Sequence, residues 1–131
     1  ASGTLHGLRL DTTPLDILHA LLEGVALRLR LIFELMGTPG EYVLAGGGAL
    51  VQSKAWTQIM ADALGVPLHL ADTPQATARG VALLIAEHQH PDDDPLASEP
   101  EVRVITPRPD TAAAYAALLD RQRELYQRLY D

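Results

Sequence analysis

The chain has 131 residues, the size of one domain, and 47% of them are hydrophobic, which is enough to build a buried core. It contains no cysteine, so disulfides, cysteine-based zinc sites and a thiol nucleophile are excluded. The net charge of −7 argues against non-specific binding of nucleic acid. No signal-peptide pattern is seen, and no apolar run approaches the ~20 residues that span a bilayer. We therefore expect a cytoplasmic α or α/β domain without nucleic-acid or membrane partners.

The first regular element is predicted to be a long helix that follows an extended lead-in over residues 1–10. Thr13 can cap this helix, Pro14 suits its first position, and Asp16 completes the spacing of a capping box. The residues from Gly37 to Gly40 end it. Apolar residues recur at steps of three and four, which makes one helical face over about six turns: Leu15, Leu18, Leu22, Val25, Leu29, Ile32 and Met36.

Gly24 interrupts this helix with a residue that is unfavourable there by about 1 kcal/mol relative to alanine. Close packing against another element is the preferred explanation. The approach of a ligand to the backbone is the alternative.

Two short strands are predicted on either side of a second helix. Residues 41–45 form the first strand and open into three glycines, and Ser53 is the expected N-cap of a helix that reaches Leu64. Gly65 suits the end of that helix, and residues 67–71 form the second strand. A crossover helix between two strands predicts that they lie parallel, in an α/β sheet flanked by helices.

The second half of the chain is predicted to contain two helices separated by a linker. A third helix is expected over residues 76–87, and a proline-rich linker over residues 91–109. Residues 110–131 form the last helix, which is expected to pack on the domain or on a partner chain. Two strands make a short sheet, so we expect a fragment that lacks part of its sheet. Its unpaired edge invites a second copy, and a homodimer is therefore a further expectation.

The glycine loop is the main candidate for a ligand site. A strand, a bare backbone turn and a helix start can present main-chain N–H groups to an anion. A P-loop is excluded because Lys54 follows Ser53 rather than a glycine. The dinucleotide pattern G-x-G-x-x-G also fails, since Val51 stands at its last position. Asp72, at the end of the second strand, keeps a dinucleotide-binding fragment open as an alternative.

Several motifs around this loop occur together in one order and spacing. They are residues 44–49, Ser53, Trp56, residues 58–59, 61–62 and 64–65, and Pro67, with residues 21–26 in the first helix and 76–84 in the third. This combination resembles the C-terminal domain of the FGGY carbohydrate kinases, a family that includes gluconate, xylulose and glycerol kinases. The resemblance covers residues 3–88, with weaker support to the end of the chain.

The resemblance implies an actin-like, ribonuclease-H-like ATPase fold, of which residues 1–90 form the nucleotide-binding half. ATP and Mg²⁺ are the implied cofactors, and a sugar or sugar acid, with xylulose or gluconate favoured, is the implied substrate. The implied contacts to the nucleotide are Gly46, Gly47, Gly48 and Ala49 at the phosphates, and Gln52 or Ser53 at the adenine or ribose. Glu23 is expected to be structural. The family's catalytic aspartate and most of its sugar contacts belong to an N-terminal domain, so we expect no catalytic residue in this chain and no activity from it alone.

Other groups of polar residues are weaker candidates for a functional site. His88 and His90 precede the three acids Asp92, Asp93 and Asp94, but a solvated loop is preferred over a metal site there. His19 and His69 are expected to be packed or surface residues, and Asp62 to be a second-shell group, a cap or a surface acid. A non-catalytic interaction module with the same half fold remains the other alternative function.

Overall fold

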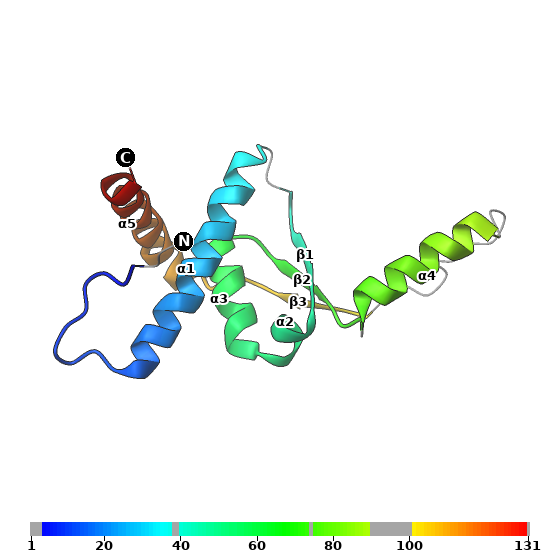
Figure 1. Cartoon of the computed structure of the whole chain (residues 1–131), viewed down its shortest axis with the longest axis horizontal. Helices are drawn as coiled ribbons and strands as arrows, with labels where there is room; N and C mark the ends of the chain where they lie inside the picture. Colours follow the sequence, from blue (N-terminus) through cyan, green and yellow to red (C-terminus); the bar gives the residue numbers. More distant parts are fainter. Residues whose placement is uncertain (1–3, 38–39, 74, 90–100, 131) are drawn as a thin grey trace.

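The computed structural model describes residues 4–37, 40–73, 75–89 and 101–130. Five α-helices, one 3₁₀ helix and three strands are found in this part of the chain (Figure 1). In chain order they are α1 (Pro14–Leu35), β1 (Val43–Gly46), α2 (Gly48–Gln52), α3 (Lys54–Leu64), β2 (Leu68–Ala71), α4 (Ala76–Gln89), β3 (Val102–Ile105), η1 (Pro109–Thr111) and α5 (Ala112–Tyr130). None of the described helices is long and apolar enough to cross a membrane.

The long helix α1 begins where its local sequence predicts. The Thr13 hydroxyl accepts a hydrogen bond from the backbone N–H of Asp16, and the Asp16 carboxylate accepts one from the backbone N–H of Thr13. This reciprocal pair is a capping box, and it satisfies N–H groups that have no partner inside the helix. The Thr13 N–H and the Thr13 hydroxyl, which also donates to the Asp16 carboxylate at 2.7 Å, lower the pKa of Asp16.

The sheet has the order β1-β2-β3. β1 and β2 lie parallel, as the crossover helix α3 predicts, with Val43 opposite Leu68 and Gly46 opposite Ala71. β3 is antiparallel to β2. The linker predicted over residues 91–109 is therefore wrong for residues 102–105, which form the third strand. The prediction missed this strand because its apolar run, Val102, Val104 and Ile105, is short. Its pairing partner, β2, lies much earlier in the chain.

The core is built around α3. This helix contacts α1, α5, β2 and β3, and seven of its eleven residues are buried. Ile59, Met60 and Ala63 belong to the predicted apolar face and lie in the core, and Trp56 packs against it. The Ser53 cap and the left-handed Gly65 at φ +72° begin and end the helix as predicted. Leu68 and Leu70 of β2 are 1% exposed and belong to the buried core.

A buried carboxylate joins α3 to the segment between β3 and α5. Asp62 has no exposed side-chain surface and accepts hydrogen bonds from the backbone N–H, Nε and Nη2 of Arg108 at 2.7, 2.9 and 2.7 Å. Gln58 Nε2 donates to the same carboxylate at 2.9 Å and also reaches the carbonyl of Thr106. Of the roles predicted for Asp62, that of a surface acid is wrong, because the carboxylate is buried and ties α3 to the segment that contains Arg108.

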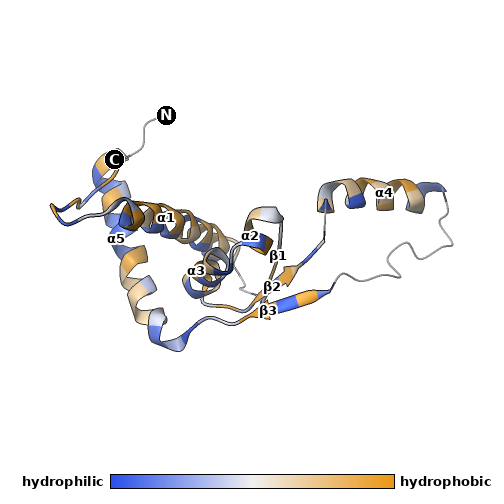
Figure 2. Cartoon of the chain, turned by 90° about the horizontal axis from the view of Figure 1, so that it is seen from below, coloured by the Kyte–Doolittle hydropathy of each residue, from blue (hydrophilic) through white to orange (hydrophobic). Residues whose placement is uncertain are grey.

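The apolar face predicted on α1 is largely exposed in the described structure. Leu15 is 72% exposed, Val25 52% and Ile32 46%, whereas the buried residues of the helix, Ala26 and Leu27, are not members of the predicted face. Figure 2 shows that hydrophobic residues make up much of α1 and recur along α4. Helix α4 extends away from the sheet (Figure 1), and its residues Val81 and Leu84 are also exposed. These surfaces have the composition of a core but no covering element in the described residues.

The last helix packs on its own domain, which was one of the two predicted arrangements. α5 contacts α1 and α3, and Tyr115 and Leu119 are buried between them. The Tyr115 hydroxyl donates a hydrogen bond to Glu23 Oε1 of α1 at 3.2 Å. Burial, followed by the nearby Glu23, raises the pKa of Tyr115 to about 12.

Candidate functional site

The glycine loop lies at the carboxyl end of β1, where it turns into α2. Gly47 has φ +109°, which non-glycine residues rarely adopt, so glycine is required there by the backbone itself. Its carbonyl accepts hydrogen bonds from the N–H groups of Leu50 and Val51 at 3.1 and 3.0 Å. The N–H groups at the start of a helix have no intrahelical acceptor, which leaves those of Gly48 and Ala49 for a ligand.

The space beside these glycines is open. A methyl group added at Gly47 or Gly48 would meet no described atom within 4 Å, and one at Gly46 would meet only the Ala71 carbonyl at 3.7 Å. Residues 46–49 are all exposed. Packing within the described chain therefore does not explain the glycine at position 48, whereas a ligand lying against the bare backbone would.

Gln52 and Ser53 differ in what their side chains already do. The Ser53 hydroxyl accepts a hydrogen bond from the N–H of Trp56 at 3.2 Å and caps α3. Gln52 is the last residue of α2 and is exposed, and no hydrogen bond of its side chain occurs among the described residues. The Ser53 hydroxyl is therefore partly used within the fold, whereas all the polar atoms of the Gln52 side chain remain available.

The end of β2 lies beside the loop. Because Gly46 pairs with Ala71 in a parallel ladder, Asp72 follows at the same edge of the sheet as Gly47. Asp72 is exposed, and its backbone N–H donates to the carbonyl of Glu101 at 3.3 Å. The structure thus brings an acid to the loop edge, where the dinucleotide alternative expected it.

The predicted histidines do not assemble a site in the described residues. His69 of β2 stacks on Tyr42 with ring centroids 4.0 Å apart, and His19 and His88 are exposed. No group of three His, Asp or Glu side chains that could hold a metal occurs in the described part of the chain. His90 and the acids Asp92, Asp93 and Asp94 lie outside the described residues.

Comparisons with known proteins identify the fold and the family. The model of the FGGY family of carbohydrate kinases, C-terminal domain, matches residues 1–87. A ribulokinase of Mycolicibacterium smegmatis is 35% identical to 95% of this chain, which covers 23% of that protein. The crystal structure of xylulose kinase from Rhodospirillum rubrum superimposes with a TM-score of 0.82 at 32% identity, over 99% of this chain and 28% of that one.

A more distant structure has the same fold. Plasmodium falciparum glycerol kinase with ADP superimposes with a TM-score of 0.75 at 18% identity, over 98% of this chain and 27% of that one. The predicted actin-like ATPase fold is confirmed by these likenesses. The chain spans about a quarter of the length of its relatives. It belongs to the FGGY family of carbohydrate kinases, as part of the C-terminal domain.

Proposed function

We propose that the chain is the C-terminal, ATP-binding part of a kinase that transfers the γ-phosphoryl group of ATP to a hydroxyl of a sugar or sugar acid. The bare glycine loop at the carboxyl end of β1 carries this proposal. Gly47, Gly48 and Ala49 would face the phosphates through their backbone, and Gln52 would contact the adenine or ribose. ATP supplies the phosphoryl group, and Mg²⁺ neutralises the phosphate charge that this acidic chain does not.

The exposed apolar surface supports a partner domain. A groove of about 230 Å³ between α1 and β1 is lined only by apolar side chains, including Leu29, Ile32 and Met36 of the exposed face. The relatives are about four times as long as this chain. We propose that the rest of the kinase, including an N-terminal domain, covers this groove and supplies the catalytic base and sugar contacts. Phosphoryl transfer needs all these groups positioned together, so the chain alone is expected to be inactive.

The substrate remains a proposal drawn from the family. Xylulose and gluconate were favoured from the sequence, and the relatives are named ribulokinase and xylulose kinase. We therefore propose xylulose as the substrate and the related ketose ribulose as the sugar to compare it with. An assay of sugar-dependent ADP release by the complete protein, with xylulose, ribulose and gluconate in parallel, decides between them.

The loop is tested by Gly48→Val with a matched change elsewhere. Valine at position 48 places a side chain in the open space where the phosphates are expected, so ADP binding by the complete protein should be lost. Gly24→Val makes the same change in open space on α1 and should leave ADP binding unchanged. Equal ADP affinity in the Gly48→Val variant and the wild type would refute the assignment of the loop.

The same protein separates the alternative functions. A non-catalytic interaction module would bind no ADP. A dinucleotide-binding fragment would bind NAD and lose it on Asp72→Ala, because the exposed carboxylate at the end of β2 would hold the ribose. Under the kinase proposal, Asp72→Ala leaves ADP binding nearly unchanged.

A further inference from the structure

Residues 101–108 lie against two elements that form the candidate nucleotide site, and we refer to these residues as the strap. The strap consists of Glu101, β3 and the three residues that follow β3. The family model matches residues 1–87, so the strap lies beyond the matched part of the chain. The sequence predicted a linker here, but the contacts of the strap join β2 to α3.

One end of the strap holds the end of β2. β3 pairs with β2 along its whole length, with Ala71 opposite Val102. One residue further, the backbone N–H of Asp72 donates a hydrogen bond to the carbonyl of Glu101 at 3.3 Å. This bond lies at the edge of the sheet where Gly46 pairs with Ala71 and where the glycine loop begins. The strap therefore stabilises the strand beside the loop.

The other end of the strap holds α3. The Thr106 carbonyl accepts a hydrogen bond from Gln58 Nε2 at 3.0 Å, and the backbone N–H of Arg108 donates to Asp62 Oδ1 at 2.7 Å. Asp62 Oδ2 depends on the Arg108 side chain, because both of its donors in the described structure are Nε and Nη2 of that residue. The Asp62 side chain is fully buried, so the loss of these donors would leave a charged oxygen unsatisfied inside the protein. We expect α3 and the strap to move apart in that case, until water reaches the carboxylate.

The position of α3 affects the glycine loop because little chain separates them. Gly47 and α2 follow β1, and Ser53 is the only residue between α2 and α3. Pairing with β2 fixes the start of this stretch, and α3 fixes its end. The backbone N–H groups of Gly48 and Ala49 lie between these two supports, which the strap connects. A displacement of about 1 Å can weaken the function of a site strongly.

We propose that Arg108 is a positioning residue for the nucleotide site. Its guanidinium satisfies Asp62 Oδ2 and holds α3 against the strap, and this keeps the N–H groups of Gly48 and Ala49 in place for the phosphates. Arg108 acts through Asp62 and α3 and not by contact with the nucleotide. The inference rests on the proposed function, since it requires that the glycine loop bind ADP and ATP.

Calorimetric titration of the complete protein with Mg-ADP tests this role. Arg108→Ala keeps the backbone N–H that Asp62 accepts and the pairing of β3, so the affinity of the folded variant for Mg-ADP should fall about fivefold or more. Arg108→Lys restores the charge but not the two parallel N–H groups, so a smaller loss is expected, and this variant carries the test if Arg108→Ala does not fold. The KM for ATP should rise with the loss of affinity, whereas the KM for the sugar should not change.

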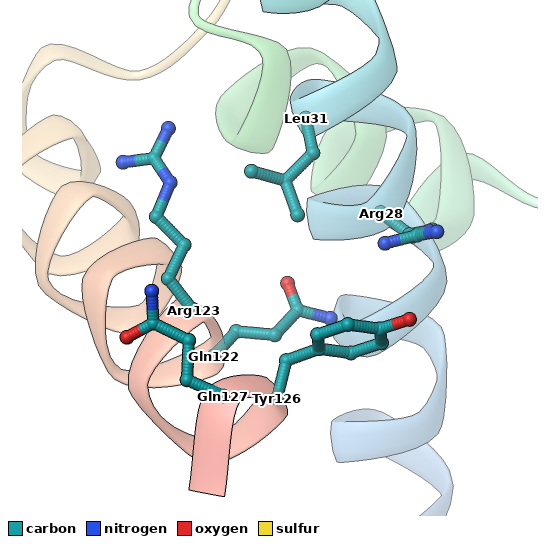
Figure 3. Close-up of a pocket in the computed structure, with 6 residues that line it drawn as sticks. All are labelled: Arg28, Leu31, Gln122, Arg123, Tyr126 and Gln127. Atoms are coloured by element: carbon teal, nitrogen blue, oxygen red, sulfur yellow. The ribbon is translucent and has the colours of Figure 1, made fainter. Parts of the chain in front are cut away.

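Arg123→Ala is the matched control. Arg123 lies on α5 (Figure 3) and pairs with Glu34 of α1 and with Asp120. Its side chain is 45% exposed, close to the 55% of Arg108, and its ion pairs do not involve the strap. The change removes the same charge, so Mg-ADP affinity should equal that of the wild type at a temperature well below the melting transitions of all variants.

Two results would overturn the role of Arg108. One is an affinity for Mg-ADP in the folded Arg108 variants equal to that of the wild type. The other is an equal loss in the Arg123→Ala variant, which would attribute the effect to charge or to overall stability. Failure of the wild type to bind Mg-ADP is a different outcome, because it would refute the proposed function itself and this inference with it.

Discussion

Replacement of Asp62 by alanine is expected to destabilise the chain more than replacement of any surface acid. The Asp62 carboxylate is fully buried and receives four hydrogen bonds, three of them from Arg108 and one from Gln58. Removing it leaves the backbone N–H of Arg108 without its acceptor, leaves Gln58 Nε2 with only the Thr106 carbonyl, and opens a small cavity next to α3. The segment between β3 and α5 loses its main tether to the core.

The magnitude follows from what is left behind. Breaking a buried charge pair by removing one partner costs about 3–5 kcal/mol when the remaining charge is trapped. Here the Arg108 side chain is 55% exposed and stays hydrated, so the lower end, about 3 kcal/mol, applies. The unfolding entropy is about 2.1 cal/mol/K for each of the 131 residues, so the melting temperature should fall by roughly 11 °C.

Thermal unfolding followed by circular dichroism measures this loss, with urea unfolding as a second estimate. Asp120→Ala is the matched control, because Asp120 is also paired with an arginine but its side chain is 73% exposed. That change should cost less than about 0.5 kcal/mol. Asp62→Asn keeps the shape but turns an N–H₂ group toward Arg108, so an intermediate loss is expected. Equal melting temperatures for the Asp62→Ala and Asp120→Ala variants would refute the reasoning.

Two further predictions concern α1 and its contact with α5. The pKa of Tyr115 is raised from 10.0 to about 12 in the folded chain, so its contribution to stability is complete below pH 10 and is lost as the pH rises toward 12. Tyr115→Phe should remove that alkaline step from melting curves recorded against pH, and an unchanged step would contradict the burial of the hydroxyl. Gly24→Ala adds a methyl group that meets no described atom within 4 Å, so it should raise the free energy of unfolding by about 0.5–1 kcal/mol. A lower stability in urea would show that this position is packed after all.

The parts of the fold that depend on neighbouring residues were predictable from the sequence. The capping box of Thr13 and Asp16, the Ser53 cap and the left-handed Gly65 each use side-chain or backbone chemistry within a few positions. The parallel pairing of β1 and β2 followed from the length and type of the element between them.

The missed features depend on residues far apart in the chain. β3 is a four-residue strand in a proline-rich region, and only its pairing with β2 makes it a strand. The burial of Asp62 is decided by Arg108, 46 positions later. The apolar period of α1 was correctly read, but a period does not tell what covers the face, and in the described structure most of it is exposed.

The position of the glycine loop in the fold was predictable from the sequence, whereas its local structure was only partly so. The sequence located the glycine loop between the strand and the helix that begins after Ser53, since a strand, glycines and a helix cap are local signals, but it did not predict the short helix α2 into which the glycines turn. It did not separate Gln52 from Ser53, because the cap predicted for Ser53 does not tell whether the side chain of Gln52 is already engaged, which only the structure shows. Whether these residues contact a nucleotide remains a prediction.

The most direct test of the central claim is a titration of the ¹⁵N-labelled chain with Mg-ADP and, separately, with NAD, followed by amide chemical shifts. The account predicts that Mg-ADP moves the signals of Gly48, Ala49 and Gln52, that NAD leaves them in place, and that Asp72→Ala does not change this pattern. Saturating Mg-ADP that leaves these three signals unmoved, or moves only residues remote from the loop, would contradict a preformed nucleotide site at the end of β1.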